Sequence, residues 1–272
     1  MRSVARSLVS LLVVASPVAA QSIAAGSSVG WVKLSDTRSE DAFSGILEYQ
    51  TGRFSLYAIP TVLHVSQDSS GQTTTRSGVG DLPLIAAASY TSPVRGSPTI
   101  GGALLVILPT GDAACGLGNG QTAAGLDVGV GLSPGRAHLS ADASRSISGV
   151  AAQSSLDAPK ATTLRVEAGY DVAPRWTWAA SVGVDLGTAD STQPLSRQLG
   201  LGVSHTLAGR LMLTVDGSHG LTSASPQWLF SVGLGTAYGG ASPVTPTSPL
   251  RRLRTTLGAG ASAGSRRAVG CR

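Results

Sequence analysis

Three kinds of residue are scarce in this chain, and each scarcity excludes a class of protein. Charged residues make up 13% of the 272 residues, against about 25% in an average soluble protein, which is untypical of a cytosolic enzyme. Aromatic residues make up 4%, and the only cysteines are Cys115 and Cys271. Two cysteines so far apart exclude a disulfide-based scaffold, and we expect both thiols to be free. The 42% of hydrophobic residues excludes a disordered chain.

Long apolar runs are also missing beyond the start of the chain. The longest candidate, residues 101–108, falls well short of the ~18 apolar residues that a membrane-spanning helix needs. Glycine is abundant, with 35 residues, but these glycines have no three-residue period, which excludes collagen. A protein of this kind that spans a membrane must do so with β-strands.

The formal charge of +5 comes from the two ends of the chain. All 15 acidic residues lie between Asp36 and Asp216, and 12 basic residues in the middle of the chain leave it a charge of −3. The other basic residues are Arg2 and Arg6 near the start and the arginines after residue 240: Arg251, Arg252, Arg254, Arg266, Arg267 and Arg272. Because the middle has no basic patch with interleaved aromatic residues, we expect no nucleic-acid partner.

The first twenty residues are typical of a signal peptide. Two arginines precede an apolar stretch at residues 8–15, and small residues at positions 18–20 precede Gln21, as a cleavage site requires. We therefore expect residues 1–20 to be removed on export. No cysteine follows the cleavage site, so a lipid anchor is not indicated.

The rest of the chain shows the alternation of apolar and small or polar residues that is typical of half-buried strands. In residues 175–186, for example, Trp176, Trp178 and Val182 alternate with threonine, alanine, serine and glycine. A soluble sandwich would place many lysine and glutamate residues on its polar face, whereas the lumen of a closed barrel in a membrane suits small residues with occasional charges.

The predicted fold is therefore all-β, a transmembrane antiparallel β-barrel of about twelve strands over residues 21–240. The strands are expected near residues 29–35, 43–50, 53–65, 79–90, 98–108, 122–132, 135–145, 162–172, 175–186, 195–207, 209–220 and 227–238. Five short turns would face the periplasm with both termini, and six longer connections, near 36–42, 66–78, 109–121, 146–161, 187–194 and 221–226, would face outward. Pro60 and Pro83 require a bulge or a strand end.

Two parts of the sequence depart from the usual pattern of such barrels. The aromatic girdles at the lipid interfaces would be thin, built mainly from Trp31, Tyr49, Tyr90, Tyr170, Trp176, Trp178, Trp228 and Tyr238. Residues 241–272 form a basic tail rich in proline, serine and arginine, without alternation, which we expect to be disordered. A passive tail and a tail that binds an anionic surface both remain open.

Several short motifs resemble a known family. The segment 77–82 (Ser-Gly-Val-Gly-Asp-Leu), the following apolar strand to Tyr90, the segment 108–112 (Leu-Pro-Thr-Gly-Asp) and the segment 117–120 (Leu-Gly-Asn-Gly) are similar in order and spacing to the outer-membrane transporter-like family named after the meta-pathway of phenol degradation. The resemblance covers residues 40–238. It implies an outer-membrane barrel that passes small, hydrophobic or aromatic compounds, with membrane lipid, lipopolysaccharide and the barrel-assembly machinery as partners.

The motif at residues 108–112 has a chemistry of its own. Pro109 ends a strand, Thr110 follows, Gly111 permits a left-handed turn and Asp112 can cap backbone amides. A structural turn is the first hypothesis. The second is that the loop folds into the mouth of the barrel, where Asp112 contacts solutes. The glycines do not form a phosphate-binding loop, because no lysine and no helix follow.

Catalysis is the weakest of the functional hypotheses. His138 and Ser140 lie two residues apart and so share a face, as in barrel lipases or deacylases, but that face is the polar one, which points away from lipid. His64, His205 and His219 are isolated and suggest no metal site. We expect no enzyme activity, no cofactor and no metal.

A pore or transporter for small solutes is the favoured function. The residues expected to line its lumen are Arg136, His138, Asp142, Arg165, Glu167, Asp171, Asp185, Arg210 and Asp216. The alternative is that these charges pair across the lumen and close a structural or adhesive barrel. Nothing in the sequence indicates the solute or the oligomeric state.

Overall fold

The computed structural model describes residues 21–69, 71–94, 96–118, 120–148, 162–186, 195–207 and 211–237. Within them the chain forms fourteen β-strands and no helix long and apolar enough to cross a membrane. The strands are β1 (Gln21–Ser35), β2 (Arg38–Thr51), β3 (Phe54–Ala58), β4 (Thr61–Ser69), β5 (Gln72–Val79), β6 (Leu82–Thr91), β7 (Thr99–Leu108), β8 (Ala123–Leu132), β9 (Ala137–Ser148), β10 (Thr162–Ala173), β11 (Trp176–Leu186), β12 (Arg197–Thr206), β13 (Leu211–Gly220) and β14 (Trp228–Ala237).

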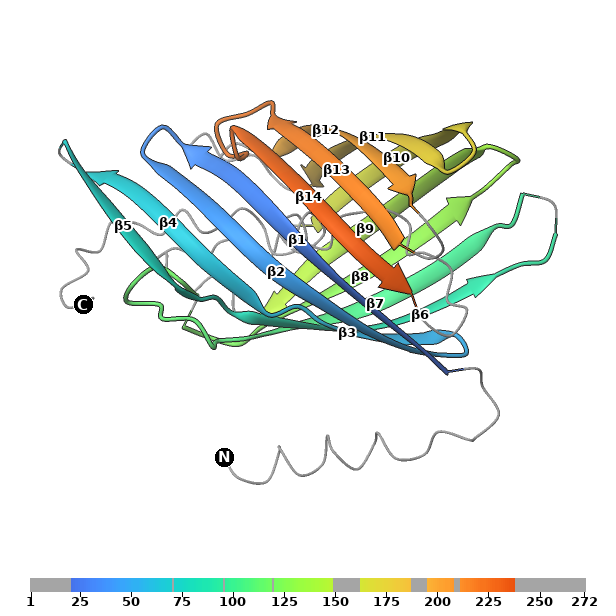
Figure 1. Cartoon of the computed structure of the whole chain (residues 1–272), viewed down its shortest axis with the longest axis horizontal. Helices are drawn as coiled ribbons and strands as arrows, with labels where there is room; N and C mark the ends of the chain where they lie inside the picture. Colours follow the sequence, from blue (N-terminus) through green and yellow to red (C-terminus); the bar gives the residue numbers. More distant parts are fainter. Residues whose placement is uncertain are drawn as a thin grey trace, which may run out of the picture.

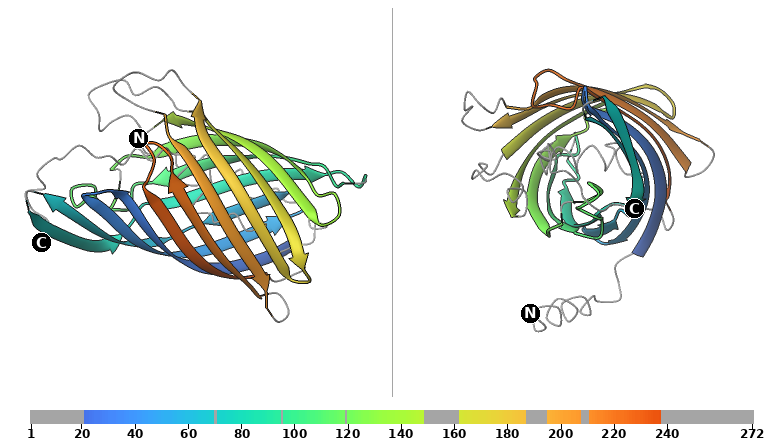
Figure 2. Two further views of the ribbon diagram at one scale, coloured as in Figure 1. Left: turned by 90° about the horizontal axis from the view of Figure 1, so that it is seen from above. Right: turned by 90° about the vertical axis from the view of Figure 1, so that its left-hand side faces the viewer.

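All neighbouring strands are antiparallel and form one sheet that closes on itself (Figure 1, Figure 2). Closure is made by β1, which pairs with β2 along one edge and with β14 along the other, from Ala24 opposite Ala237 to Lys33 opposite Trp228. Each strand from β7 to β13 pairs with the strands before and after it in the sequence. Closure removes the free edges of the wall, except along β5, which pairs with β4 alone among the described strands.

The fourteen strands make a barrel of twelve, as the alternation predicts, because two of the twelve are interrupted. Residues 47–51 of β2 pair with β3, and residues 38–44 of β2 pair with β4. The strands β3 and β4 therefore form one wall strand that is broken at residues 59–60. Likewise, β5 pairs with β4 and β6 pairs with β3, with a break at residues 80–81.

The two prolines lie at these interruptions, where the loss of an amide donor is tolerated. Pro60 occupies the break between β3 and β4, and its carbonyl oxygen accepts a 2.9 Å hydrogen bond from the backbone N–H of Gly45. Pro83 is the second residue of β6, and its carbonyl oxygen accepts a 3.0 Å bond from Ile59. The bulge or strand end that the sequence requires is therefore present at both positions.

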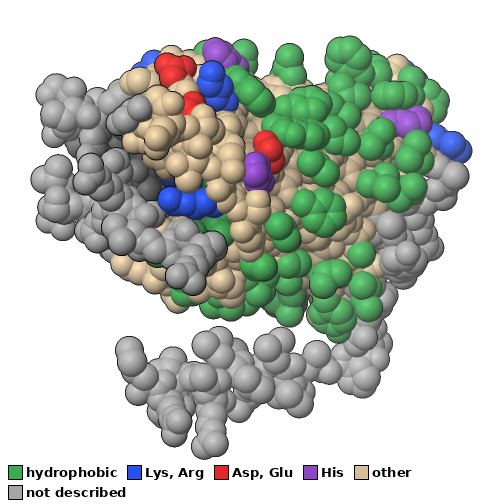
Figure 3. Space-filling model, turned by 60° about the vertical axis from the view of Figure 1, so that its left-hand side comes forward, with side chains coloured by type: hydrophobic (Ala, Val, Ile, Leu, Met, Phe, Trp, Pro, Cys, Tyr) green, Lys and Arg blue, Asp and Glu red, His purple; other side chains and the backbone are tan. Residues whose placement is uncertain are grey.

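Alternate residues of each strand point outward, and these are largely apolar. Trp178, Leu201 and Ile100 expose 58%, 65% and 61% of their surface, and hydrophobic side chains cover much of the outer wall in Figure 3. The neighbouring residues point inward and are small, polar or charged, as with Ser181 beside the exposed Val182. This distribution is that of a barrel whose outer surface contacts lipid.

The connections separate the barrel into two unlike ends. The end that holds Gln21 and Ala237 has short turns near residues 52–53, 92–98, 133–136 and 174–175, as predicted for the periplasmic side. Two of the expected outer loops are wrong: residues 36–42 hold only the turn at residues 36–37, and residues 66–78 belong mostly to the hairpin of β4 and β5. The expectation failed there because Ser, Thr and Gln dominate this hairpin and hide the alternation.

Most aromatic side chains of the wall lie on its outer face, whereas Tyr57 lies opposite the lumen residue Glu48 and faces inward. Among the predicted girdle residues, Trp31, Tyr90, Tyr170, Trp176, Trp178 and Trp228 are exposed, Tyr49 is half-buried, and Tyr238 lies outside the described residues. Trp31 packs against Phe230 with ring centroids 5.6 Å apart. The guanidinium of Arg53 stands 4.6 Å above the ring of Tyr90, which suits a cation at a membrane interface.

Candidate functional site

The inner face of the barrel carries most of the charged residues that the sequence suggested as a lining. His138, Asp142, Arg165, Glu167, Asp171, Asp185 and Asp216 all occupy inward positions of β9, β10, β11 and β13. Arg136 instead lies in the exposed turn before β9, and Arg210 is outside the described residues. Uncharged lumen positions are held by buried Ser28, Ser44, Ser144, Thr163, Ser181, Ser204 and Ser231.

Five further charged residues point into the lumen and were missed by sequence reasoning. They lie on β2, β5 and β8: Arg38, Glu40, Glu48, Arg76 and Asp127. On β2 the alternation itself was the available signal, since the exposed Phe43 and Leu47 mark the odd positions as outward. The predicted strand began at residue 43, whereas β2 begins at residue 38, and the prediction therefore left out Arg38 and Glu40.

The ion pairs within the described residues follow the wall and do not cross the lumen. Arg165 and Glu167, two residues apart on β10, are 2.6 Å apart between Nη2 and Oε2. His138 on β9 and Asp171 on β10 are 3.1 Å apart on neighbouring strands. Thr177 and Thr163 donate hydrogen bonds of 2.6 and 2.7 Å to Asp171 and Asp185.

The described inner wall carries more acidic than basic side chains. Its inward carboxylates are Glu40, Glu48, Asp127, Asp142, Glu167, Asp171, Asp185 and Asp216, and its inward guanidinium groups are Arg38, Arg76 and Arg165. These eight acids, together with Asp81 at the break between β5 and β6, outnumber the three arginines of the described inner wall.

One part of the inner wall is apolar. Ile59, Leu105, Ile107 and Ala123 form a buried cluster, against which Ile46 and Ile85 pack. Leu105 and Ile107 point inward, since the preceding residue Leu104 is exposed on the outside and side chains alternate along the strand. This cluster lies where β7 ends and the loop to β8 begins.

The loop between β7 and β8, residues 109–122, folds onto the inner wall. Asp112 caps the loop itself: its Oδ1 accepts hydrogen bonds from the backbone N–H groups of Ala114 (2.9 Å) and Cys115 (3.2 Å). Its carbonyl oxygen also accepts a 2.9 Å bond from the N–H of Leu117. Asp112 therefore stabilises a turn within the loop, which is the structural role that the first hypothesis gave it.

Two hydrogen bonds hold the loop against residues 80–81, where the wall strand is broken between β5 and β6. The Thr110 hydroxyl donates a 2.7 Å hydrogen bond to the Gly80 carbonyl, and the Gly111 N–H donates a 3.0 Å bond to Oδ1 of Asp81. A β-carbon at Gly111 would overlap the carbonyl oxygen of Leu117, so this close approach requires glycine. The two sequence motifs of the resemblance therefore meet in space.

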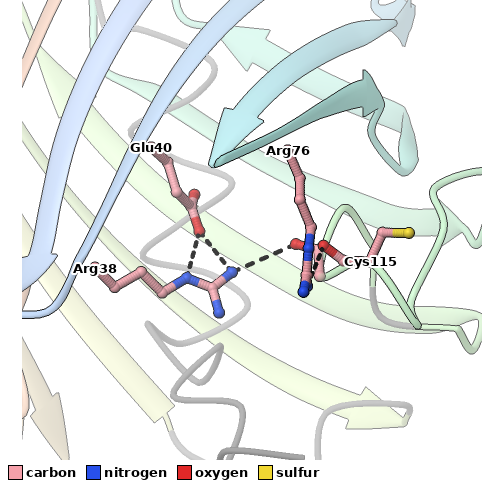
Figure 4. A network of polar contacts seen from close by, with 5 residues as sticks. Arg38, Glu40, Arg76 and Cys115 are labelled. Atoms are coloured by element: carbon pink, nitrogen blue, oxygen red, sulfur yellow. Dashed lines mark hydrogen bonds and ion pairs between the residues drawn. The ribbon is translucent and has the colours of Figure 1, made fainter. Parts of the chain in front are cut away.

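Two lumen arginines hold the far side of the loop (Figure 4). Nη1 of Arg76 donates a 3.3 Å hydrogen bond to the carbonyl oxygen of Cys115, and Nη2 of Arg38 donates a 3.4 Å bond to that of Gly116. Glu40 accepts two bonds from Arg38, at 3.0 and 3.2 Å. Figure 2 shows the loop, in green, within the ring of strands, and it lies at the end of the barrel opposite Gln21 and Ala237.

Cys115 is disulfide-bonded, which corrects the expectation of a free thiol. Its Sγ lies 3.2 Å from Oδ2 of Asp112. The low number of cysteines argued against a scaffold of disulfides, but it does not exclude a single bond in an exported protein.

The arrangement around His138 differs from the His138–Ser140 pair considered for catalysis. The Nδ1 atom of the ring lies 3.2 Å from the Ser133 hydroxyl, and Nε2 lies 3.1 Å from Asp171. These contacts join the turn before β9 to the end of β10. No group of three or more potential metal ligands occurs among the described residues.

Comparisons with known proteins place the chain in a family. No curated protein matches the sequence. The structure is similar to that of the COG4313 outer membrane channel from Pseudomonas putida F1, with 17% identity, a TM-score of 0.57 and coverage of 82% of this chain and 97% of that one. It is also similar to the NanC porin, with 9% identity, a TM-score of 0.52 and coverage of 80% and 100%.

At these identities the two structures support the fold alone, which is the predicted closed antiparallel barrel. The family model described as "Putative MetA-pathway of phenol degradation" matches residues 22–238. This range contains every barrel strand except the first residue of β1. The chain belongs to this family of outer-membrane β-barrels, as the motifs at residues 77–82 and 108–112 suggested.

Proposed function

We propose that this protein is an outer-membrane channel that passes small solutes. The observation that carries the proposal is the contrast between the two faces of one closed wall: an exposed apolar outer face and an inner face of serine, threonine and charged side chains. A barrel of this kind presents its apolar face to membrane lipid and a polar path to water-borne solutes. The loop at residues 109–122 forms the constriction of that path, and no enzymatic step is needed.

The charge of the inner wall also indicates which class of solute would pass. Because acidic side chains outnumber basic ones on the described wall, small cations and neutral polar molecules pass more readily than anions of the same size. The family description links these barrels to phenol degradation, and the apolar cluster around Ile107 offers one surface for an aromatic ring. Neutral phenol is accordingly a candidate solute, whereas an aromatic carboxylate is disfavoured.

The test is the current through the purified full-length protein in a planar lipid bilayer. Discrete steps of current are expected, measured with and without a reductant because Cys115 is disulfide-bonded, together with faster swelling of liposomes in phenol than in benzoate. The variant Arg38→Ala/Arg76→Ala, which removes two contacts to the loop, should raise the conductance. Arg145→Ala, on the outer face of β9, is the matched control and should not.

A closed structural barrel is the second candidate, because the loop is held on the inner wall at Asp81, Arg76 and Arg38. Absence of current steps under both oxidising and reducing conditions, with no solute-dependent swelling, would overturn the channel and favour this candidate.

A further inference from the structure

Three side chains on the outer face of the wall lie in one row across three neighbouring strands. Asp41 on β2 is opposite His64 on β4, and His64 is opposite Ser77 on β5. All three residues are exposed, and Nδ1 of His64 lies 2.6 Å from the hydroxyl oxygen of Ser77. A carboxylate, an imidazole and a hydroxyl in this order have the composition of a hydrolase triad.

The pattern of backbone hydrogen bonds explains why this ring and this hydroxyl are so close. The N–H of Gly80 donates a 2.8 Å bond to the carbonyl oxygen of Thr61, and opposite residues in an antiparallel ladder alternate between bonded and non-bonded pairs. Three positions along β4, His64 and Ser77 therefore form a non-bonded pair, the type in which the side chains are closer. In such a pair the backbone N–H of Ser77 points away from β4.

The N–H of Ser77 points toward an open edge of the sheet. Among the described strands β5 pairs with β4 alone, so no strand of the described wall accepts a hydrogen bond from this N–H. The backbone N–H of a nucleophilic serine is the kind of donor that binds the oxyanion of an acyl-transfer intermediate. The nucleophile, its base and an oxyanion donor therefore come from two neighbouring strands.

The row lies at the boundary between the polar and the apolar part of the outer wall. Toward the middle of the barrel, the next outward row consists of exposed apolar side chains: Phe43, Val62 and Val79. Toward the rim, the next outward row consists of hydroxyl-bearing side chains: Ser39, Ser66 and Thr75. Trp31 on β1 lies opposite Asp41 and is 37% exposed. Because tryptophan gathers at the interface of lipid and water, the row lies at the depth where lipid headgroups join their acyl chains.

This position removes the objection to catalysis at His138 and Ser140. Those two side chains lie on the lumen face of β9, away from lipid. The side chains of His64 and Ser77 instead face the lipid, where acyl esters are found. The sequence left His64 isolated because Ser77 is 13 residues away on another strand, and only the strand pairing brings them together.

We propose that Ser77, His64 and Asp41 form an outer-face site that hydrolyses acyl esters of membrane lipids. The Ser77 oxygen attacks the ester carbonyl carbon while Nδ1 of His64 takes the hydroxyl proton. The ester C–O bond then breaks, His64 gives the proton to the departing alkoxide, and the acyl group stays on Ser77. Water, which loses a proton to His64, releases the fatty acid and restores the hydroxyl. Asp41 is a positioning residue whose charge stabilises the imidazolium. This activity does not depend on the proposed channel function.

The nucleophile is tested with the full-length protein in phospholipid vesicles and an alkyl fluorophosphonate, which reacts with activated serine hydroxyls. Peptide mapping should place the phosphonate on Ser77, and Ser77→Ala should lose the label. His64→Gln should react about a hundredfold more slowly, because the hydroxyl has lost its base. Thr75→Ala, on the same strand and face, is the matched control and should react like the parent. An unlabelled Ser77 in a barrel with normal heat-modifiable mobility, or an equal rate in His64→Gln, would overturn the site.

The substrate is tested by the release of fatty acid from two kinds of vesicle, one of phosphatidylethanolamine and one that also contains lipid A. Release from the first kind supports a phospholipase, and fatty acid that comes from lipid A alone supports a deacylase. Release no faster than in Ser77→Ala from both kinds would overturn the proposal. Asp41→Asn should lower kcat at least about tenfold with an unchanged KM, because the carboxylate acts on the imidazolium and not on the lipid. An unchanged kcat would overturn the role of Asp41.

Discussion

Asp81 accepts a 3.0 Å hydrogen bond from the backbone N–H of Gly111, and this contact joins the break in one wall strand to the loop at residues 109–122. The break between β5 and β6 turns Asp81 toward the loop, and the loop in turn requires glycine where it meets Leu117. An irregularity of the wall therefore serves as the docking point of the loop. The placement of the loop in the lumen depends on this pair together with the two lumen arginines.

Replacing Asp81 by alanine should loosen the loop. The Gly111 N–H loses its acceptor, which costs about 1–3 kcal/mol of unfolding free energy if water does not replace it. Denaturant titration, followed by the heat-modifiable mobility of the barrel on gels, measures the loss. Asp81→Asn keeps an acceptor oxygen and should retain most of the stability, so equal losses in both variants would contradict this role.

Gly111→Ala should disturb the same docking point by steric overlap. The added carbon would meet the Leu117 backbone, so the loop must move away from the wall. Proteolysis of the intact barrel should then cut the loop faster than in the parent protein. Gly183→Ala is the matched control, because a carbon at Gly183 on β11 meets nothing within 4 Å; faster cleavage in this variant as well would point to a general loss of stability.

The sequence was informative wherever one face of a strand is continuously apolar. From β10 to β14 the predicted strands agree with the structure to within a few residues, because alternation fixes both the register and the inward face. That alternation placed seven of the nine candidate lining residues on the inner wall. Their contact with solutes stays a prediction.

The sequence was less informative where long-range contacts decide the structure. The fastening of Gly111 to Asp81 joins residues 30 apart, and no local pattern predicts such a bond. The polar hairpin of β4 and β5 looked like a loop, because its strand pairing does not depend on a buried apolar face. The bond at Cys115 was missed because cysteine number indicates a disulfide scaffold but not an individual disulfide.

Removing one partner of the buried ion pair on β10 should lower the free energy of unfolding. Arg165 and Glu167 expose 5% and 12% of their side chains, so Arg165→Met leaves a carboxylate without its partner and should cost about 3–5 kcal/mol. The double variant Arg165→Met/Glu167→Met should cost far less, since no unpaired charge remains. Denaturant titration of the three proteins tests the coupling, and additive losses would show that the pair is already well hydrated.

Adjacent positions on β11 provide a test of the barrel wall as a whole. Val182 is 44% exposed on the outer face and lies near the middle of the strand, while Ser181 is 7% exposed and faces the lumen opposite Glu167. Val182→Arg should lose about 2–4 kcal/mol of folding free energy in lipid, because the charge must reside near the membrane midplane.

Ser181→Arg should lose much less than Val182→Arg, since Glu167 stands beside it as a counter-charge. Both variants are refolded into vesicles and titrated with denaturant under the same conditions. If the two losses are equal, or if Ser181→Arg is the more damaging, the inward and outward faces of β11 are exchanged and the assignment of the lumen charges on β10 and β11 fails with them.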